Sequence, residues 1–214
     1  MPACNICGSE TFKAAPNNRL SLKKIAPLCA KCGSLERHRL GRDIAAAVRI
    51  RDKFQSYALL DVGADNTVPK GWFASNKMVQ ANEDAIQLPR SEDSKFGFIV
   101  CSHVIQKMRS PREAIQRLLR ALSPEGIFLL SYPSPATRDT TEGFSRRSRH
   151  EKGPLFIFGK DFEKEYRAMA PNTYVVAADG VDAVTGDQDI VYLLTKSPFW
   201  TTRMVKQLNA RLIQ

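Results

Sequence analysis

The chain has 214 residues, a formal net charge of +10, 43% hydrophobic residues and 25% charged residues. This length allows one substantial domain with a small additional module, and the composition is ordinary for a globular protein. No apolar run approaches the roughly 20 residues that a membrane-spanning helix requires, and no signal-peptide core is visible, so a cytoplasmic location is expected.

Four of the five cysteines lie in two CxxC motifs near the N-terminus, at Cys4 and Cys7 and at Cys29 and Cys32. Two such motifs supply four thiolates, the usual ligand set of a tetrahedral structural zinc ion. A disulfide is disfavoured in a cytosolic chain, and a redox role would require a thioredoxin-like βαβ context that is absent around these motifs. Residues 1–34 are therefore predicted to form a zinc-binding module.

A helical connection between this module and the main domain is expected at residues 35–56. Leu40, Ile44 and Val48 recur on one helical face. Ser34 precedes the helix and is a suitable N-cap residue.

A buried strand followed by a glycine turn comes next. Tyr57–Val62 is a short apolar run, and Gly63 then starts a turn with Ala64 and Asp65. Small residues in such a turn let the backbone approach a ligand closely. A second strand is predicted at Met78–Ala81.

The middle of the chain reads as strand, helix and strand. The apolar run that starts at Phe96 is typical of a strand buried on both faces. Residues 112–122 carry isoleucine and leucine at helical spacing, and Pro124 and Gly126 end this helix before an apolar run at Ile127–Tyr132. Two strands joined by a helix imply a right-handed crossover in a parallel sheet. The fold class is therefore predicted to be α/β.

An irregular basic insertion occupies residues 133–155. It is predicted to be a surface loop or lid whose basic cluster either clamps a phosphate or a nucleic-acid backbone or only makes the surface more soluble. A helix over Asp161–Ala170 and strands over Thr173–Ala178 and Asp189–Thr195 are predicted to follow. Residues 199–214 are predicted to form a basic amphipathic tail helix.

Several of these segments resemble class I S-adenosylmethionine-dependent methyltransferases, especially those grouped as type 11. The turn Ser102–Ile105 is similar to the end of the family's fourth strand, and Ser123–Gly126 is a variant of its LxPGG motif. Cys32–Arg39, which reads CGSLERHR, is similar to a motif that follows an N-terminal cysteine zinc knuckle in a subset of the family. The resemblance implies a Rossmann-like sheet, abbreviated because only residues 69–94 are available for the second and third strands.

The resemblance also implies a site for the methyl donor at the carboxyl ends of the strands. Asp84 corresponds to the acid that meets the adenine amino group, and Glu83 is the remaining candidate for the acid that binds the ribose. Alternatively, Glu83 and Asp84 belong to a solvated loop. The residues expected to bind S-adenosylmethionine are Asp61, Gly63, Ala64, Asp65, Glu83, Asp84, Ala85 and Ser102.

His103 is the candidate general base, because it stands at the carboxyl end of a strand, where α/β folds bind ligands. His38 and His150 are the alternates. A histidine at a strand end is also often only a hydrogen-bonded structural residue. The residues expected to contact the substrate are Arg37, His38, Glu142 and His150. Arg37 and His38 alternatively belong to a solvated basic start of the helix.

These features predict a zinc-binding module (1–34), a connecting helix (35–56), a methyltransferase-like domain (57–198) and a tail helix (199–214). The predicted function is S-adenosylmethionine-dependent methylation of a small-molecule or polymer acceptor. The net charge of +10 favours an anionic acceptor, nucleic acid included, or is only a solvated basic surface. The alternative is a protein of the same fold without catalysis, which binds RNA, an acidic glycan or a protein. The reduced glycine turn and the short second-strand region motivate that alternative.

Overall fold

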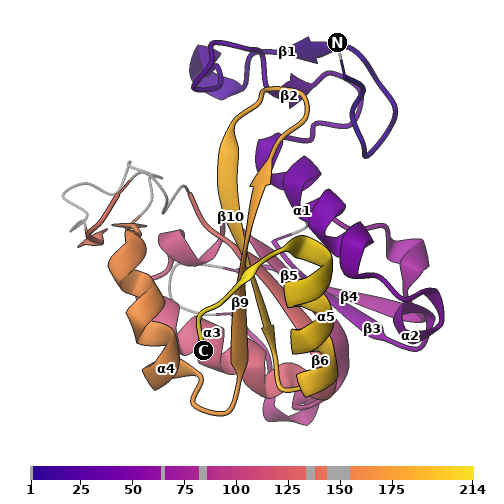
Figure 1. The fold of residues 1–214 in the computed structure, drawn as a ribbon, viewed down its shortest axis with the longest axis vertical. Coiled ribbons are helices and arrows are strands. Elements are labelled where there is room, and N and C mark those ends of the chain that lie inside the picture. Colours follow the sequence, from indigo (N-terminus) through magenta and orange to yellow (C-terminus); the bar gives the residue numbers. More distant parts are fainter. Residues whose placement is uncertain (1, 64–65, 82–85, 134–137, 144–154) are drawn as a thin grey trace.

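The computed structural model describes residues 2–63, 66–81, 86–133, 138–143 and 155–214, and a seven-stranded mixed sheet forms its centre (Figure 1). In spatial order the strands are β11 (Arg211–Leu212), β9 (Tyr174–Val181), β10 (Gln188–Thr195), β6 (Leu122–Ser131), β5 (Phe96–Ser102), β3 (Ala58–Val62) and β4 (Ser75–Val79). The β4, β3, β5 and β6 strands run parallel, whereas β10 is antiparallel to both β6 and β9. The predicted α/β class is confirmed.

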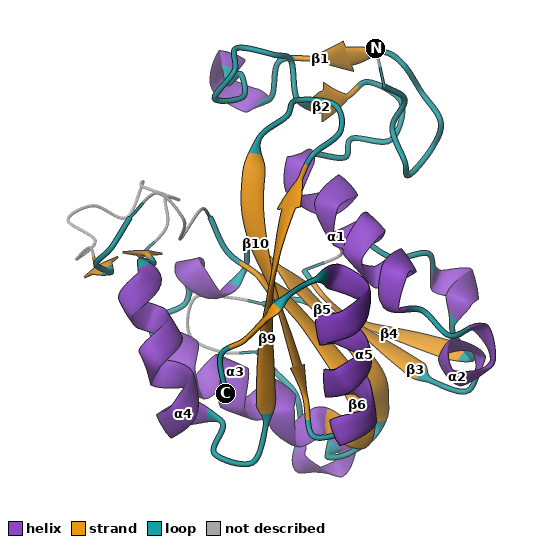
Figure 2. Ribbon diagram, in the orientation of Figure 1, coloured by secondary structure: helices purple, strands orange, loops and turns teal. Residues whose placement is uncertain are grey.

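Helices cover both faces of this sheet (Figure 2). One face packs against α1 (Glu36–Val48), α2 (Arg51–Gln55) and α5 (Pro198–Leu208), and the other against α3 (Pro111–Ala121) and α4 (Tyr166–Met169). The strand β5 is buried along its whole length, and its alternate residues contribute to the two cores. This explains its continuous apolar sequence, since a strand covered on both faces has no solvated side. Among the described residues no helix is long and apolar enough to cross a membrane.

Short elements complete the described chain. They are the strands β1 (Phe12–Lys13), β2 (Leu28–Cys29), β7 (Glu142–Gly143) and β8 (Phe156–Ile157), and the 3-10 helices at Pro16–Asn18, Lys70–Trp72, Arg90–Glu92, Ile105–Lys107 and Lys160–Glu165. Between β4 and β5, the described residues add no further strand to the sheet, so β4 lies at its edge. This agrees with the abbreviated sheet that the short sequence between the two strands predicts.

The N-terminal module sits above the turn that joins β9 to β10 (Figure 1). Arg39 in α1 forms a buried ion pair with Asp182 in this turn; the two side chains are 2% and 1% exposed, and Nε lies 2.7 Å from Oδ1. The same guanidinium donates to the carbonyl oxygen of Pro27 at 2.9 Å. The backbone N–H of Leu22 donates to Asp187 Oδ2 at 2.9 Å. The module is therefore fixed to the sheet by the buried contacts of Arg39 and by one exposed hydrogen bond.

Two predicted helices are wrong in detail. Instead of one helix over Asp161–Ala170, the chain forms a 3-10 helix and then the single turn α4. The predicted tail helix over 199–214 ends at Leu208, where Asn209 adopts a left-handed conformation (φ 48°), and β11 then pairs with β9. An αL residue ends a helix by turning the chain away from its axis.

The predicted strand at Met78–Ala81 is also displaced. The structure has β4 at Ser75–Val79, because the register with β3 pairs Asp61 with Met78 and Val62 with Val79. Similarly, β6 begins at Leu122 rather than at Ile127. In both cases pairing with a neighbouring strand, which a single sequence does not show, decides the boundary.

Candidate functional site

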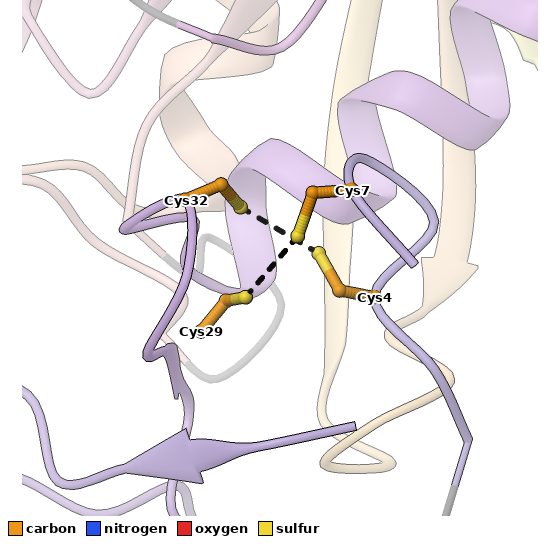
Figure 3. Close-up of side chains that lie close together, drawn as sticks. All are labelled: Cys4, Cys7, Cys29 and Cys32. Carbon is orange, nitrogen blue, oxygen red and sulfur yellow. Dashed lines mark hydrogen bonds between the residues drawn. The ribbon is translucent and has the colours of Figure 1, made fainter. Parts of the chain in front are cut away.

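The four N-terminal cysteines converge in the N-terminal module (Figure 3). The Sγ atoms of Cys4 and Cys32 are 3.8 Å apart and those of Cys7 and Cys29 are 3.5 Å apart. All four sulfur atoms lie within 4.8 Å of one another. Zinc–sulfur bonds of about 2.3 Å in a tetrahedron place sulfur atoms about 3.8 Å apart, so this arrangement can hold one tetrahedral metal ion.

Both CxxC motifs have the same backbone conformation. In each, the glycine after the second cysteine has a positive φ, 74° at Gly8 and 72° at Gly33. Its N–H donates to the carbonyl oxygen of the first cysteine, at 2.8 Å in one motif and 3.0 Å in the other. Backbone N–H groups within each motif also donate to the sulfur of Cys4 or Cys29. Such donors stabilise thiolates, the form of cysteine that binds metals.

Ser34, which the sequence suggests as the N-cap of α1, belongs to this cluster instead. Its side chain is buried, and its Oγ lies 3.2 Å from the sulfur of both Cys4 and Cys32. The helix starts one residue later, after Leu35, whose N–H donates to His38 Nδ1 at 2.9 Å. His38 therefore caps the helix, a role that neither the substrate-contact nor the alternate-base prediction includes.

A pocket of about 570 Å³ lies between the N-terminal module and the carboxyl edge of the sheet. Its lining comes from the N-terminal module, the start of α1, the turns after β5 and β6, the turn between β9 and β10, and the start of β10. The lining residues are Ala15, Pro16, Arg19, Leu20, Leu22, Leu35, Glu36, Arg37, Leu40, His103, Pro133, Asp182, Asp187, Gln188 and Asp189. The pocket thus brings His103 and Arg37 together, two of the residues predicted from the sequence.

His103 has a strained backbone that its neighbours hold in place. Its φ is 54°, a left-handed value that costs a residue with a Cβ roughly 1–3 kcal/mol. Its N–H donates to the carbonyl oxygen of Ser131 at 2.9 Å, and Gln106 Nε2 donates to its carbonyl oxygen at 2.7 Å. Such over-determined strain is typical of functional sites.

The His103 side chain points toward Asp189 at the start of β10. Its Nε2 lies 3.9 Å from Asp189 Oδ2 and has no hydrogen-bond partner among the described residues. Burial, together with the positive charge of Arg37, holds the pKa of His103 well below its usual 6.5. The imidazole is therefore neutral at pH 7, with a ring nitrogen available to accept or donate one hydrogen bond.

Asp189 is a site residue that sequence reasoning missed. It is the first residue of a predicted strand, and nothing in its sequence position signals a function. Burial, opposed in part by the N–H of Ile190 and assisted by the nearby charge of Glu36, raises its pKa from 3.8 to about 7. Only the antiparallel return of β10 beside β6 places it next to His103.

Replacement of Asp189 by asparagine is expected to remove part of the pH dependence of stability. Because the native pKa is raised, the native state binds a proton that the unfolded state releases, and stability falls as the pH rises toward and past 7. Between pH 6 and 8 the wild type should lose about 1.4 kcal/mol more free energy of unfolding than the variant. Urea unfolding of both proteins at pH 6, 7 and 8 measures this difference, and parallel pH profiles would contradict it.

The structure describes three of the residues predicted to bind the donor, Asp61, Gly63 and Ser102. Gly63 follows β3 with a φ of 94°, and a Cβ at this position would lie 3.0 Å from Val104 Cγ2. The glycine turn therefore packs directly against the turn that contains His103. Asp61 and Ser102 are buried, at 3% and 6% exposed. The remaining donor candidates, Ala64, Asp65, Glu83, Asp84 and Ala85, lie outside the described residues.

Glu142, another substrate candidate, does not line the pocket. Glu142 is exposed in β7 and forms an ion pair with Arg138. His150 lies outside the described residues. Thr141, the residue before Glu142, has a structural partner, because its Oγ1 donates to Asp161 Oδ1 at 2.7 Å. The segments around Thr141 and Asp161, 20 positions apart, therefore pack together.

The chain is similar in structure to several methyltransferases. A methyltransferase from Leishmania major described as S-adenosylmethionine-dependent superposes with a TM-score of 0.50 at 11% identity, over 72% of each chain. A possible histamine N-methyltransferase from Thermotoga maritima gives a TM-score of 0.46 at 12% identity, over 75% of this chain and 89% of that chain. A 1,6-didemethyltoxoflavin N1-methyltransferase from Burkholderia thailandensis gives 0.43 at 13% identity, over 72% and 78%. At such identities the likeness concerns the fold alone.

Sequence comparison identifies the family directly. No curated protein matches the chain significantly. A family model described as a methyltransferase domain matches residues 5–179, well over half of the chain. The chain therefore belongs to the methyltransferase-domain family, with the Rossmann-like sheet of its class I members.

Proposed function

We propose that the protein is an S-adenosylmethionine-dependent methyltransferase whose acceptor binds in the pocket beside His103. The observation that carries this proposal is the position of His103. Its neighbour Val104 contacts the glycine turn at Gly63, and its own side chain lines the pocket on the other side. A residue between a donor turn and an acceptor pocket lies where a methyl group would be transferred. None of the comparisons favours the alternative without catalysis.

The described part of the donor side fits this cofactor. Gly63 has no side chain and a positive φ, so the backbone after β3 is open to close approach by a ligand. Ser102, at the carboxyl end of β5, accepts a hydrogen bond from Ser131 Oγ at 3.2 Å, and its own hydroxyl can donate. S-adenosylmethionine would supply an electrophilic methyl group, so the protein would need mainly to position the acceptor.

The His103–Asp189 pair would hold and deprotonate the acceptor. An acceptor oxygen or nitrogen about 2.8 Å from each partner fits between atoms 3.9 Å apart, with an angle of about 90° at the acceptor atom. The neutral imidazole can take a proton from this atom as the methyl group arrives. Asp189, with a pKa of about 7, can hold the same group in place through a second hydrogen bond.

We also propose that the four-cysteine cluster binds a structural zinc ion. All four ligand positions would be filled by thiolates, so this ion would stabilise the module without taking part in the reaction. The module in turn supplies part of the pocket lining, from Ala15 to Leu22. The ion would therefore affect the acceptor site only by stabilising the fold of the module.

Calorimetric titration of the zinc-loaded protein with S-adenosylmethionine and S-adenosylhomocysteine tests donor binding. Dissociation constants in the micromolar range are expected. Gly63→Val should weaken both by at least tenfold, because valine is strained at a positive φ and would press on Val104. Gly71→Ala is the matched control, since its position is open and not left-handed. Absence of binding by the folded wild type, with its thermal transition intact, would disprove the proposal.

His103→Ala is expected to lower methyl transfer at least 100-fold while donor affinity changes less than threefold. Loss of a general base typically costs 10²–10⁴ in rate, whereas the residues proposed to bind the donor do not include His103. Transfer of labelled methyl from the donor to a pool of acceptors from cell extract gives the rate, and calorimetry gives the affinity. Unchanged transfer by the variant would remove His103 from the mechanism.

A further inference from the structure

Two buried polar atoms of the pocket that lack a hydrogen-bond partner among the described residues can act as hydrogen-bond acceptors. His103 Nε2 and Asp187 Oδ1 are buried and have no hydrogen-bond partner among the described residues. The second oxygen of Asp187 is already used by the N–H of Leu22. Asp189 adds a third group beside them. Buried acceptors without partners are costly, so a ligand that carries donor groups would stabilise this site.

Most of the positive charge around the pocket is already neutralised. Arg19 makes a bidentate pair with Glu36, with N–O distances of 2.9 and 3.0 Å. The charge of Arg39 is neutralised by its buried ion pair with Asp182. Arg37 is the remaining cation of the lining and already has an interaction of its own. Within the part of the chain that the structure describes, the pocket therefore lacks the excess of available cations that recognises phosphate or carboxylate groups.

The lining from the N-terminal module is largely apolar. Ala15, Pro16, Leu20 and Leu22 face the pocket, and Leu35 and Leu40 continue the apolar surface on α1. The side chains of Leu20 and Leu22 are 42% and 74% exposed at the rim. Such exposed leucines beside a pocket can extend apolar contact with a ligand beyond the pocket itself.

We infer that the acceptor is an amphiphile, with a neutral or cationic head that donates hydrogen bonds at Asp187, Asp189 and His103, and an apolar chain along Leu20 and Leu22. An amine can donate to more than one of these groups, and a hydroxyl group can donate to one of them. Either can accept a methyl group, provided that its proton, or the extra proton of a cationic amine, passes to His103. The inference rests on the proposed function, because it assigns this pocket to the methyl acceptor. It replaces the anionic acceptor that the net charge of the chain favours.

Three probes that share an eight-carbon alkyl chain and differ in their polar head group test this inference: octan-1-ol, octylamine and octanoate. Each is titrated into zinc-loaded protein saturated with S-adenosylhomocysteine, and binding is followed by ligand-observed NMR. The alcohol, the amine or both should bind at least tenfold more tightly than octanoate, and the tighter one identifies the head group. Leu22→Ser should weaken the bound probes at least threefold without changing the affinity for S-adenosylhomocysteine.

Leu212→Ser is the matched control, because Leu212 is 52% exposed in β11 and does not line the pocket. It should leave all probe affinities unchanged. Equal or tighter binding of octanoate, no binding of any probe, or an equal effect of both leucine variants would overturn the inference. Failure of S-adenosylhomocysteine to bind would instead disprove the proposed function, so the two failures are distinguishable.

Discussion

Replacement of Arg39 by leucine is expected to lower the free energy of unfolding by about 3–5 kcal/mol, the usual cost of removing one partner from a buried ion pair. The variant would leave the Asp182 carboxylate, whose side chain is 1% exposed, without its cation. It would also remove the donor to the Pro27 carbonyl oxygen. Urea unfolding followed by tryptophan fluorescence, with zinc in the buffer, measures the effect.

Arg112→Leu is the matched control for this variant. Arg112 also pairs with a carboxylate through two bonds, at 2.5 and 2.6 Å to Glu165, but its side chain is 64% exposed. Exposed pairs contribute little to stability, because water solvates both partners once they separate. The free energy of unfolding should therefore be nearly unchanged. Equal losses in the two variants would show that burial of the Arg39 pair does not decide its contribution.

Replacement of Cys29 by serine is expected to abolish zinc binding and to unfold the N-terminal module. Cys29 is fully buried, and serine cannot supply the fourth thiolate. Structural zinc contributes on the order of 10 kcal/mol to the folding of small modules, which have little apolar core of their own. Zinc content by mass spectrometry should fall from one ion per chain to none, and the thermal transition should move to lower temperature.

Cys101→Ala provides the control for this experiment. Cys101 is buried in β5 and stands apart from the cluster that the other four cysteines form. The variant should retain one zinc ion per chain even if its core is slightly weakened. A wild-type protein without zinc, or a Cys29→Ser variant that retains it, would contradict the proposed zinc site.

The two variants should disturb the N-terminal module in different ways. Loss of zinc should release the CxxC motifs, whereas loss of Arg39 should release the module from the turn that contains Asp182. In both variants the pocket loses the support of its lining from Ala15 to Leu22. Acceptor-probe binding should therefore weaken in both, while binding to the donor turn at Gly63 should change less.

The secondary structure was predictable where hydrophobic periodicity is strong. The sequence of strand, helix and strand around β5, α3 and β6 follows from apolar runs of distinct period, bounded by proline and glycine. The boundaries of β4 and the end of the tail helix were not predictable. In these places hydrogen bonds to a distant strand compete with local preference, and a single sequence does not show which strands become neighbours.

The sequence by itself determined the α/β class, the four-cysteine cluster and the position of His103 at the end of a buried strand. These features depend on local pattern and residue type, which are readable along the chain. Only the tertiary structure decided that Asp189 faces His103, that Arg39 is buried against Asp182, and that the N-terminal module lines the pocket. Each of these contacts joins residues more than eighty positions apart. The chain pairs them through β-strand order and burial, which no local sequence pattern encodes.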